Sequence, residues 1–203
     1  MNLDTWLIYL LAATGLSLSP GPNGLLALTH GALHGRRKTL YTIFGGACGF
    51  TTVVALSMLG IGALLQASLM WLIIMKWVGG AYLIWLGIEV WRSPPISVEV
   101  RGAAEPRGGW SLFRQGALSA LTNPKALLFF AAFLPQFIDP DRSLFVQFVV
   151  MAGTFAVIEM ATEVFIAGMA HRISPWLARA GRRFNQACGG VFIAIGLALP
   201  LRS

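Results

Sequence analysis

An apolar run covering residues 3–28 is interrupted by a polar segment that holds two prolines around a glycine: Ser19, Pro20, Gly21, Pro22 and Asn23. Proline has no N–H group, so each proline leaves a carbonyl group one turn earlier without its helical partner, and glycine leaves helical geometry at low cost. The segment therefore predicts a break inside a helix. Deep in a bilayer, open backbone is tolerated only where protein or a water-filled cavity satisfies it, so the break also predicts a binding site or pathway.

The composition predicts that the chain is an integral membrane protein. Of the 203 residues, 56% are hydrophobic and 11% are charged, and the mean hydropathy is +0.70. This balance is too apolar for a water-soluble globular domain. The net charge of +7 does not indicate a partner nucleic acid, because the basic residues fall in short loops between apolar runs.

Six stretches are long enough to cross the hydrocarbon core, which needs about 20 apolar residues per helix. They cover residues 3–28, 39–65, 68–91, 113–138, 144–169 and 185–201. The predicted fold class is all-α, with six transmembrane helices of which the first and fourth are broken. A linker at residues 92–112, rich in Pro and Gly, divides the chain into two three-helix repeats, residues 1–91 and 113–203.

The loops predict the orientation, because loops rich in Lys and Arg stay in the cytoplasm. Eleven basic residues lie near three alternate loops, and three lie on the opposite side. The basic side holds Arg36, Arg37, Lys38, Arg92, Arg101, Arg107, Arg114, Arg172, Arg179, Arg182 and Arg183, and the other side holds Lys76, Arg142 and Arg202. We therefore expect both termini on the outer side of the membrane.

Each half has three crossings, so the second half enters the membrane from the opposite side and the halves can form an inverted repeat. A shift of 102 residues aligns Pro22 with Pro124 and places Asn23 opposite Lys125. A separate shift of 109 residues aligns a pair of glycines in the third stretch with a pair in the sixth, namely Gly80 and Gly87 with Gly189 and Gly196.

The second break consists of Thr122, Asn123, Pro124 and Lys125, and it is expected to leave the carbonyl group of Ala120 without its helical partner. It lies about 15–18 Å into its stretch, near the middle of the membrane. A lysine at that depth normally faces the interior of the bundle with a partner. A substrate carboxylate is one candidate partner of Lys125. The alternatives are a protein carboxylate or snorkelling to the interface.

The fifth stretch supplies two carboxylates, Glu159 and Glu163, which are four residues apart and share one helical face. Glu159 and Pro20 each lie about 21 Å into their stretches, at one level of the membrane. A carboxyl group there can carry a proton or bind a substrate's ammonium group. We expect Glu159 to couple transport to protons, whereas Glu163 is either a second coupling group or an interfacial residue.

Other residues with reactive or ligating side chains form no clear motif. His30 and His34 have the i, i+4 spacing of a metal pair but no glutamate between them, and Cys48 and Cys188 match no metal or redox spacing. The sequence also lacks a nucleophile elbow, a phosphate-binding loop and a dinucleotide fingerprint. We therefore expect a protein that is not an enzyme and that uses no cofactor or resident metal.

Six segments spread over nearly the whole chain together form one pattern: Gly15–Asn23, Gly35–Lys38, Gly45–Gly49, Lys76–Gly87, Thr122–Lys125 and Gly189–Gly196. This pattern resembles the LysE/RhtB family of bacterial amino-acid exporters. The resemblance implies export of amino acids or derivatives, such as homoserine, threonine, lysine or leucine, across the bacterial inner membrane. It further implies that the proton gradient drives export and that the protein is often a homodimer. With the orientation predicted from the loops, both termini would be periplasmic.

The two breaks together would form the substrate site. The site would include exposed backbone at residues 19–23 and 122–124. Lys125 would bind the substrate's carboxylate, and Glu159 would bind its ammonium group or exchange the proton. A metal-ion exporter of the same superfamily is the alternative, although it would carry more His, Asp or Cys. A relative that moves reducing equivalents through paired cysteines at its breaks does not match Cys48 and Cys188. A site built largely from backbone does not specify which amino acid is carried.

Overall fold

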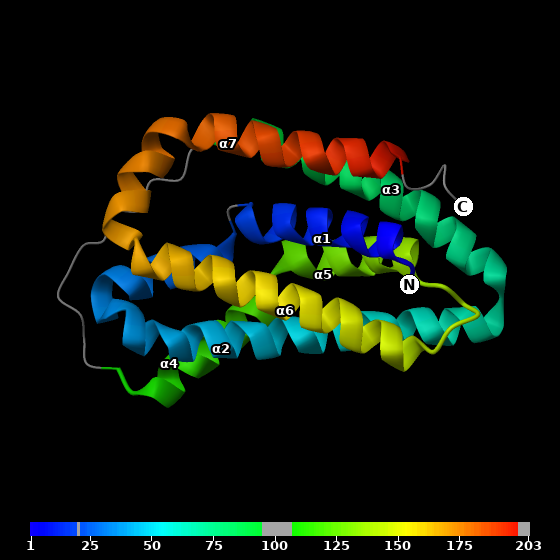
Figure 1. Cartoon of the computed structure of the whole chain (residues 1–203), viewed down its shortest axis with the longest axis horizontal. Helices are drawn as coiled ribbons and strands as arrows, with labels where there is room; N and C mark the ends of the chain where they lie inside the picture. The colour runs from blue at the N-terminus through cyan, green and yellow to red at the C-terminus, as the bar shows by residue number, and fades with distance from the viewer. Residues whose placement is uncertain (20, 95–106, 199–203) are drawn as a thin grey trace.

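Every secondary-structure element in the described part of the chain is a helix, which confirms the predicted all-α class. The computed structural model describes residues 1–19, 21–94 and 107–198 (Figure 1). The helices are α1 (Leu3–Leu18), α2 (Pro22–Ala67), α3 (Leu69–Arg92), α4 (Gly109–Leu121), α5 (Pro124–Phe133), the 3₁₀ helix η1 (Leu134–Phe137), α6 (Leu144–Gly168) and α7 (Ala170–Ala198).

Three of the described helical segments are long and apolar enough to cross a membrane, namely Pro22–Leu64, Ile73–Arg92 and Leu144–Gly168. A fourth candidate is the pair Gly109–Leu121 and Pro124–Phe137, which is bent by 51° at the second break. Helix α1 has 16 residues, fewer than the roughly 20 of a straight crossing. By length and composition the described helices thus provide three or four spans, and the number six stays a prediction.

Helix α2 changes direction along its length. Figure 1 shows it folding back on itself at the left of the view, and Gly35 inside it has φ 76° and ψ 164°. This positive φ is a conformation that glycine adopts without the steric cost of a side chain. The turn therefore falls at the first residue of the basic segment Gly35–Lys38.

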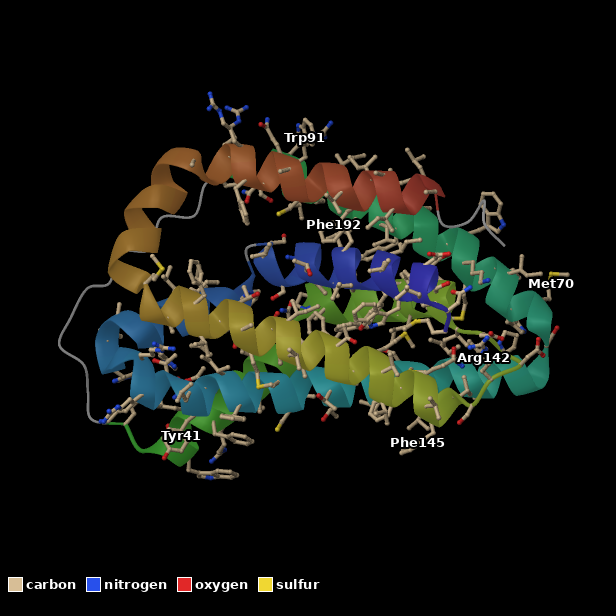
Figure 2. The ribbon with its side chains drawn as sticks, in the orientation of Figure 1. Tyr41, Met70, Trp91, Arg142, Phe145 and Phe192 are labelled. Carbon is tan, nitrogen blue, oxygen red and sulfur yellow. The ribbon has the colours of Figure 1, made fainter. Side chains whose placement is uncertain are left out.

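The two ends of the molecule differ in charge. Figure 1 places the fold-back of α2, the start of α4 and the α6–α7 junction at one end, so the basic residues of Gly35–Lys38 and of Arg107–Arg114 lie toward that end. The start of α1, the α2–α3 turn, the loop before α6 and the last turns of α7 lie at the opposite end. Arg142 is labelled there in Figure 2.

An aromatic core joins α1, α5, α6 and α7. Its fully buried rings are those of Tyr9, Phe129, Phe130, Phe133, Phe155 and Phe192, and Figure 2 shows Phe192 pointing from α7 toward α1. The outer faces carry large apolar side chains, such as Leu59 and Phe145, which are each 72% exposed. Exposed apolar surface of this kind suits contact with lipid chains.

Helices α3 and α7 pack with their backbones in contact at glycines. A Cβ atom added to Gly87 would lie 2.7 Å from the carbonyl oxygen of Gly189, and one added to Gly196 would lie 2.7 Å from that of Gly80. Real Cβ atoms essentially never approach backbone within 3.0 Å. Glycine is therefore required at both positions for the observed helix separation. Small residues permit the same close approach where membrane helices pack together.

Candidate functional site

The first break separates α1 from α2. The backbone N–H of Ser19 donates to the carbonyl group of Gly15 over 3.0 Å and closes the last turn of α1. Gly21 is extended, with φ −154°, and Pro22 is the first residue of α2. Pro20, predicted for the same site, lies outside the described residues.

The first turn of α2 faces the break without a cap. Gly21 makes no side-chain capping bond, so the N–H groups of Asn23 and Gly24 have no acceptor within the helix. The positive end of the α2 dipole also lies here. Such a helix start is suited to hold an anionic group.

The second break has a different local structure, because a side chain caps it. The Oδ1 atom of Asn123 accepts hydrogen bonds from the backbone N–H groups of Lys125 (3.1 Å) and Ala126 (3.4 Å). Pro124 occupies the first turn of α5, where its missing N–H costs nothing. Asn123 therefore fixes the start of α5 and the position of Lys125.

One expectation about this break is wrong. The carbonyl group of Ala120, expected to lack a partner, accepts the backbone N–H of Asn123 over 3.3 Å. The chain tightens after Leu121, so a neighbouring N–H replaces the one that Pro124 lacks. Thr122 is exposed, and its hydroxyl donates to the carbonyl group of Leu118 over 2.7 Å.

The side chain of Lys125 joins the two breaks. Its Nζ atom donates to the carbonyl oxygen of Ser19 over 3.1 Å, although the two residues are 106 positions apart in sequence. A cavity of about 20 Å³ lies between the breaks, which is roughly the space of one water molecule. Its walls are Leu16, Ser17, Ser19, Gly21, Asn23, Gly24, Phe50, Asn123, Lys125, Ala126, Phe155 and Glu159.

Two buried carboxyl groups on α6 face the breaks. Glu159 is 5% exposed and Glu163 is 2% exposed. Glu159 interacts electrostatically with Lys125 and faces the hydroxyl group of Ser17. Glu163 lies beside the side-chain amide of Asn23, one turn further along α6. The helix α6 therefore presents one carboxyl group to each side of the first break.

Buried polar atoms without partners concentrate at this cavity. Within the described residues, six buried side-chain oxygen atoms have no hydrogen-bond partner. Four of them line the cavity: Ser17 Oγ, Ser19 Oγ, Asn23 Oδ1 and Glu159 Oε2. Each such atom normally lowers the free energy of unfolding by about 1–3 kcal/mol. Their clustering is characteristic of a site that binds a polar ligand or ion.

The structure brings six of the predicted site residues to one cavity: Ser19, Gly21, Asn23, Asn123, Lys125 and Glu159. Glu163 is buried next to Asn23 but does not line the cavity. Pro22, Thr122 and Pro124 are exposed and do not line the cavity.

Sequence reasoning missed six residues of the wall: Leu16, Ser17, Gly24, Phe50, Ala126 and Phe155. Ser17 is a polar residue in the last turn of α1, and this position next to the break could have identified it. Phe50 and Phe155 form a T-shaped pair with ring centroids 5.3 Å apart, and both rings belong to residues that line the cavity. No sequence signal distinguishes them, because apolar residues dominate both α2 and α6.

His30, His34 and Cys48 do not line this cavity, whereas Cys188 on α7 interacts electrostatically with Lys125 in the cavity wall. His30 Nδ1 is 2.8 Å from the hydroxyl oxygen of Thr42, and the ring of His34 lies 5.4 Å from that of His30. Cys48 on α2 is exposed and Cys188 on α7 is buried, and neither is in a disulfide. Among the described residues no group of three or more His, Cys, Asp or Glu side chains could hold a metal ion.

Comparisons with known proteins give consistent results. The family model described as LysE type translocator matches residues 14–203. The homoserine/homoserine lactone efflux protein of Salmonella typhimurium is 35% identical over 98% of this chain and 97% of its own length. The leucine efflux protein of an Enterobacter species is 29% identical over 97% of this chain and 95% of its own length. No solved structure gives a significant match.

Proposed function

Because the chain belongs to the LysE type translocator family, and is therefore a membrane transporter and not an enzyme, we propose that it exports amino acids or their derivatives. The exported molecules include neutral amino acids such as homoserine. The protein lies in the bacterial inner membrane and exchanges these molecules for protons. The names of two relatives, which are efflux proteins for homoserine and leucine, support this substrate class. The observation that carries the proposal is the cavity where two helix breaks, Lys125 and Glu159 meet.

The cavity wall matches the two charges of an amino acid. The N–H groups of Asn23 and Gly24 at the start of α2, together with the ammonium group of Lys125, are donors for the substrate's carboxylate. On α6, Glu159 provides an acceptor for the substrate's ammonium group. In this arrangement Lys125 exchanges its bond to the carbonyl oxygen of Ser19 for one to the substrate.

Proton coupling is assigned to Glu159. A carboxyl group buried in the membrane is favourable either when it carries a proton or when a cation compensates its charge. Glu159 has two cations within its reach during transport, the side chain of Lys125 and the substrate's ammonium group. Substrate release toward the outside then favours proton uptake from the outside, which is the order of events in antiport. Glu163 with Asn23 is the neighbouring polar pair through which a proton can leave.

The closed cavity agrees with an alternating-access cycle. Its volume of about 20 Å³ is too small for an amino acid. The walls come from α1, α2, α5 and α6, so opening toward either side needs relative movement of these helices. Transporters with broken helices commonly open by rocking one part of the bundle against the other.

We further propose six crossings in two inverted repeats, residues 1–91 and 113–203, joined by a cytoplasmic linker at 92–112. The segment Pro22–Leu64 has 43 residues and contains the turn at Gly35, enough for parts of two crossings. The gathering of basic segments at one end (Figure 1) supports periplasmic termini.

The contacts between α3 and α7 support the inverted repeat. A Cβ at Gly87 would also meet Ile193 at 2.7 Å, and one at Gly196 would meet Ile84 at 2.9 Å. A shift of 109 residues converts each contact into the other, since it relates 84 to 193 and 87 to 196. A two-fold axis between two antiparallel helices produces this exchange.

Transport into inverted membrane vesicles tests the proposed function. Vesicles from cells that produce the protein are made acidic inside and supplied with labelled homoserine, threonine, leucine and lysine in turn. We expect at least one of these to accumulate only in the presence of the proton gradient. Movement of none of them, with resistance of producing cells to Ni²⁺ or Cd²⁺ instead, would contradict the proposal and favour a metal-ion exporter.

A further inference from the structure

A second cavity lies at the end of the molecule opposite the basic segments. It has a volume of about 270 Å³, an order of magnitude more than the cavity at the breaks. Its walls are Met1, Asn2, Thr5, Ile8, Lys76, Gln136, Phe137, Ile138, Asp139, Pro140 and Arg142. These residues come from α1, α3, η1 and the loop before α6, and Figure 2 shows Arg142 in that loop, near the start of α1.

The wall of this second cavity carries charges of both signs. Lys76 and Arg142 are cationic and Asp139 is anionic, and Arg142 Nε lies 3.0 Å from Asp139 Oδ2. Asp139 Oδ1 accepts the backbone N–H of Asp141 over 3.1 Å. A carboxylate has about four acceptor positions, so Asp139 can accept further bonds. The cavity thus offers both a cation and an anion to a zwitterion.

Gln136 adds an independent indication of a ligand. Its Nε2 atom donates to the backbone carbonyl oxygen of Lys76, but its buried Oε1 atom has no hydrogen-bond partner within the described residues. Six buried side-chain oxygen atoms among the described residues have no hydrogen-bond partner. Four of them belong to residues that line the cavity at the breaks, and a fifth, Gln136 Oε1, belongs to a residue that lines this second cavity. Gln136 and Asp139 line the same cavity, and their acceptor oxygen atoms are suited to an ammonium group.

Aromatic rings separate the two cavities. Along α1 the wall of the first cavity ends at Leu16 and that of the second begins at Ile8, which are about 12 Å apart. Tyr9 lies between them, stacked on Phe133 at 5.8 Å and in edge contact with Phe137 at 5.5 Å. Phe137 also lines the second cavity. A substrate that moves outward along α1 therefore meets this aromatic barrier and then the second cavity.

We propose that the second cavity is an outer binding site for the exported amino acid, which it occupies after leaving the breaks. Lys76 binds the carboxylate, and Asp139 with Gln136 binds the ammonium group. This inference rests on the proposed function. It assigns substrate recognition on the outer side to residues that take no part in the central site or in proton coupling.

The test compares apparent affinity at the two faces of the membrane. Right-side-out vesicles give the half-saturating concentration of homoserine for exchange at the outer face, and inverted vesicles give it for the inner face. We expect Lys76→Gln to raise the outer value about tenfold, as the loss of one charge-assisted bond does. The inner value should change less than about twofold, and Lys76→Arg should restore the outer value.

The controls separate this proposal from the proposed function. Lys38 is an exposed lysine at the opposite end, and Lys38→Gln should change neither the outer nor the inner half-saturating concentration. Asp139→Asn is a second variant that should also act at the outer face alone. Equal effects of Lys76→Gln at both faces, or no effect at either, would overturn the outer site while the exporter assignment stands. Wild-type vesicles that move neither homoserine nor any other amino acid would overturn both.

Discussion

Alanine substitutions at Gly87 and Gly196 are expected to destabilise the protein by similar amounts. Each added Cβ would lie 2.7 Å from a carbonyl oxygen of the facing helix, whereas carbon–oxygen contacts between helices are about 3.3–3.6 Å. Helices α3 and α7 must therefore separate by about 0.6 Å. A gap of that size forfeits roughly a quarter to a half of each dispersion contact. We expect a loss of about 1–3 kcal/mol in the free energy of unfolding for each variant.

The double variant distinguishes this reasoning from unrelated damage. Once one alanine has separated the helices, the second alanine meets less resistance, so Gly87→Ala with Gly196→Ala should cost less than the sum of the single changes.

The assay is unfolding of the purified protein in mixed micelles by increasing dodecyl sulfate. Gly60→Ala and Gly153→Ala serve as matched controls, because a Cβ at either glycine meets nothing within 4 Å. These controls should be unchanged or more stable by up to about 1 kcal/mol, since alanine favours helix. Equal stability of Gly87→Ala and Gly60→Ala would refute the close packing of α3 on α7.

Two further predictions concern side chains that make hydrogen bonds to the backbone. Asn123→Ala removes the cap of α5 and should lower stability by about 0.5–2 kcal/mol and reduce export, because Lys125 loses its fixed position, whereas Asn123→Ser should retain most of both. Unfolding and vesicle transport measure the two effects, and a fully active Asn123→Ala protein would contradict the role of the cap. Tyr9→Phe removes the bond from Tyr9 Oη to the carbonyl oxygen of Met151, 2.9 Å long, and should cost about 0.5–1.5 kcal/mol. The exposed Tyr41→Phe is its control in the same titration, and equal stability of the two variants would disagree with the structure.

Local chemistry made the breaks predictable from the sequence. Prolines lack a donor wherever they occur, so the ends of α1 and α4 near Pro22 and Pro124 follow from residue type alone. The contact between Lys125 and Ser19 could be anticipated only in outline, from the alignment of the two halves. The hydrogen bond that satisfies Ala120 was missed, because it depends on how tightly the chain turns after α4.

Other features depend on the packing of distant segments. The aromatic wall formed by Phe50 and Phe155, and the second cavity beside Lys76, arise where helices far apart in sequence meet. In a chain with 56% hydrophobic residues, an apolar residue that lines a cavity has the same pattern as one that faces lipid. The number of crossings is also difficult to determine from the helices, because α2 continues through its turn at Gly35 and α1 is short.

Proton-driven accumulation by Glu159→Gln tests the central assignment most directly. Inverted vesicles that are acidic inside receive labelled homoserine. Glu89 is an exposed glutamate on α3, and Glu89→Gln is the matched control. The account predicts that Glu159→Gln loses the stimulation by the gradient, while Glu89→Gln accumulates homoserine as the wild type does. Accumulation by a normally inserted Glu159→Gln protein to the wild-type level would contradict the account.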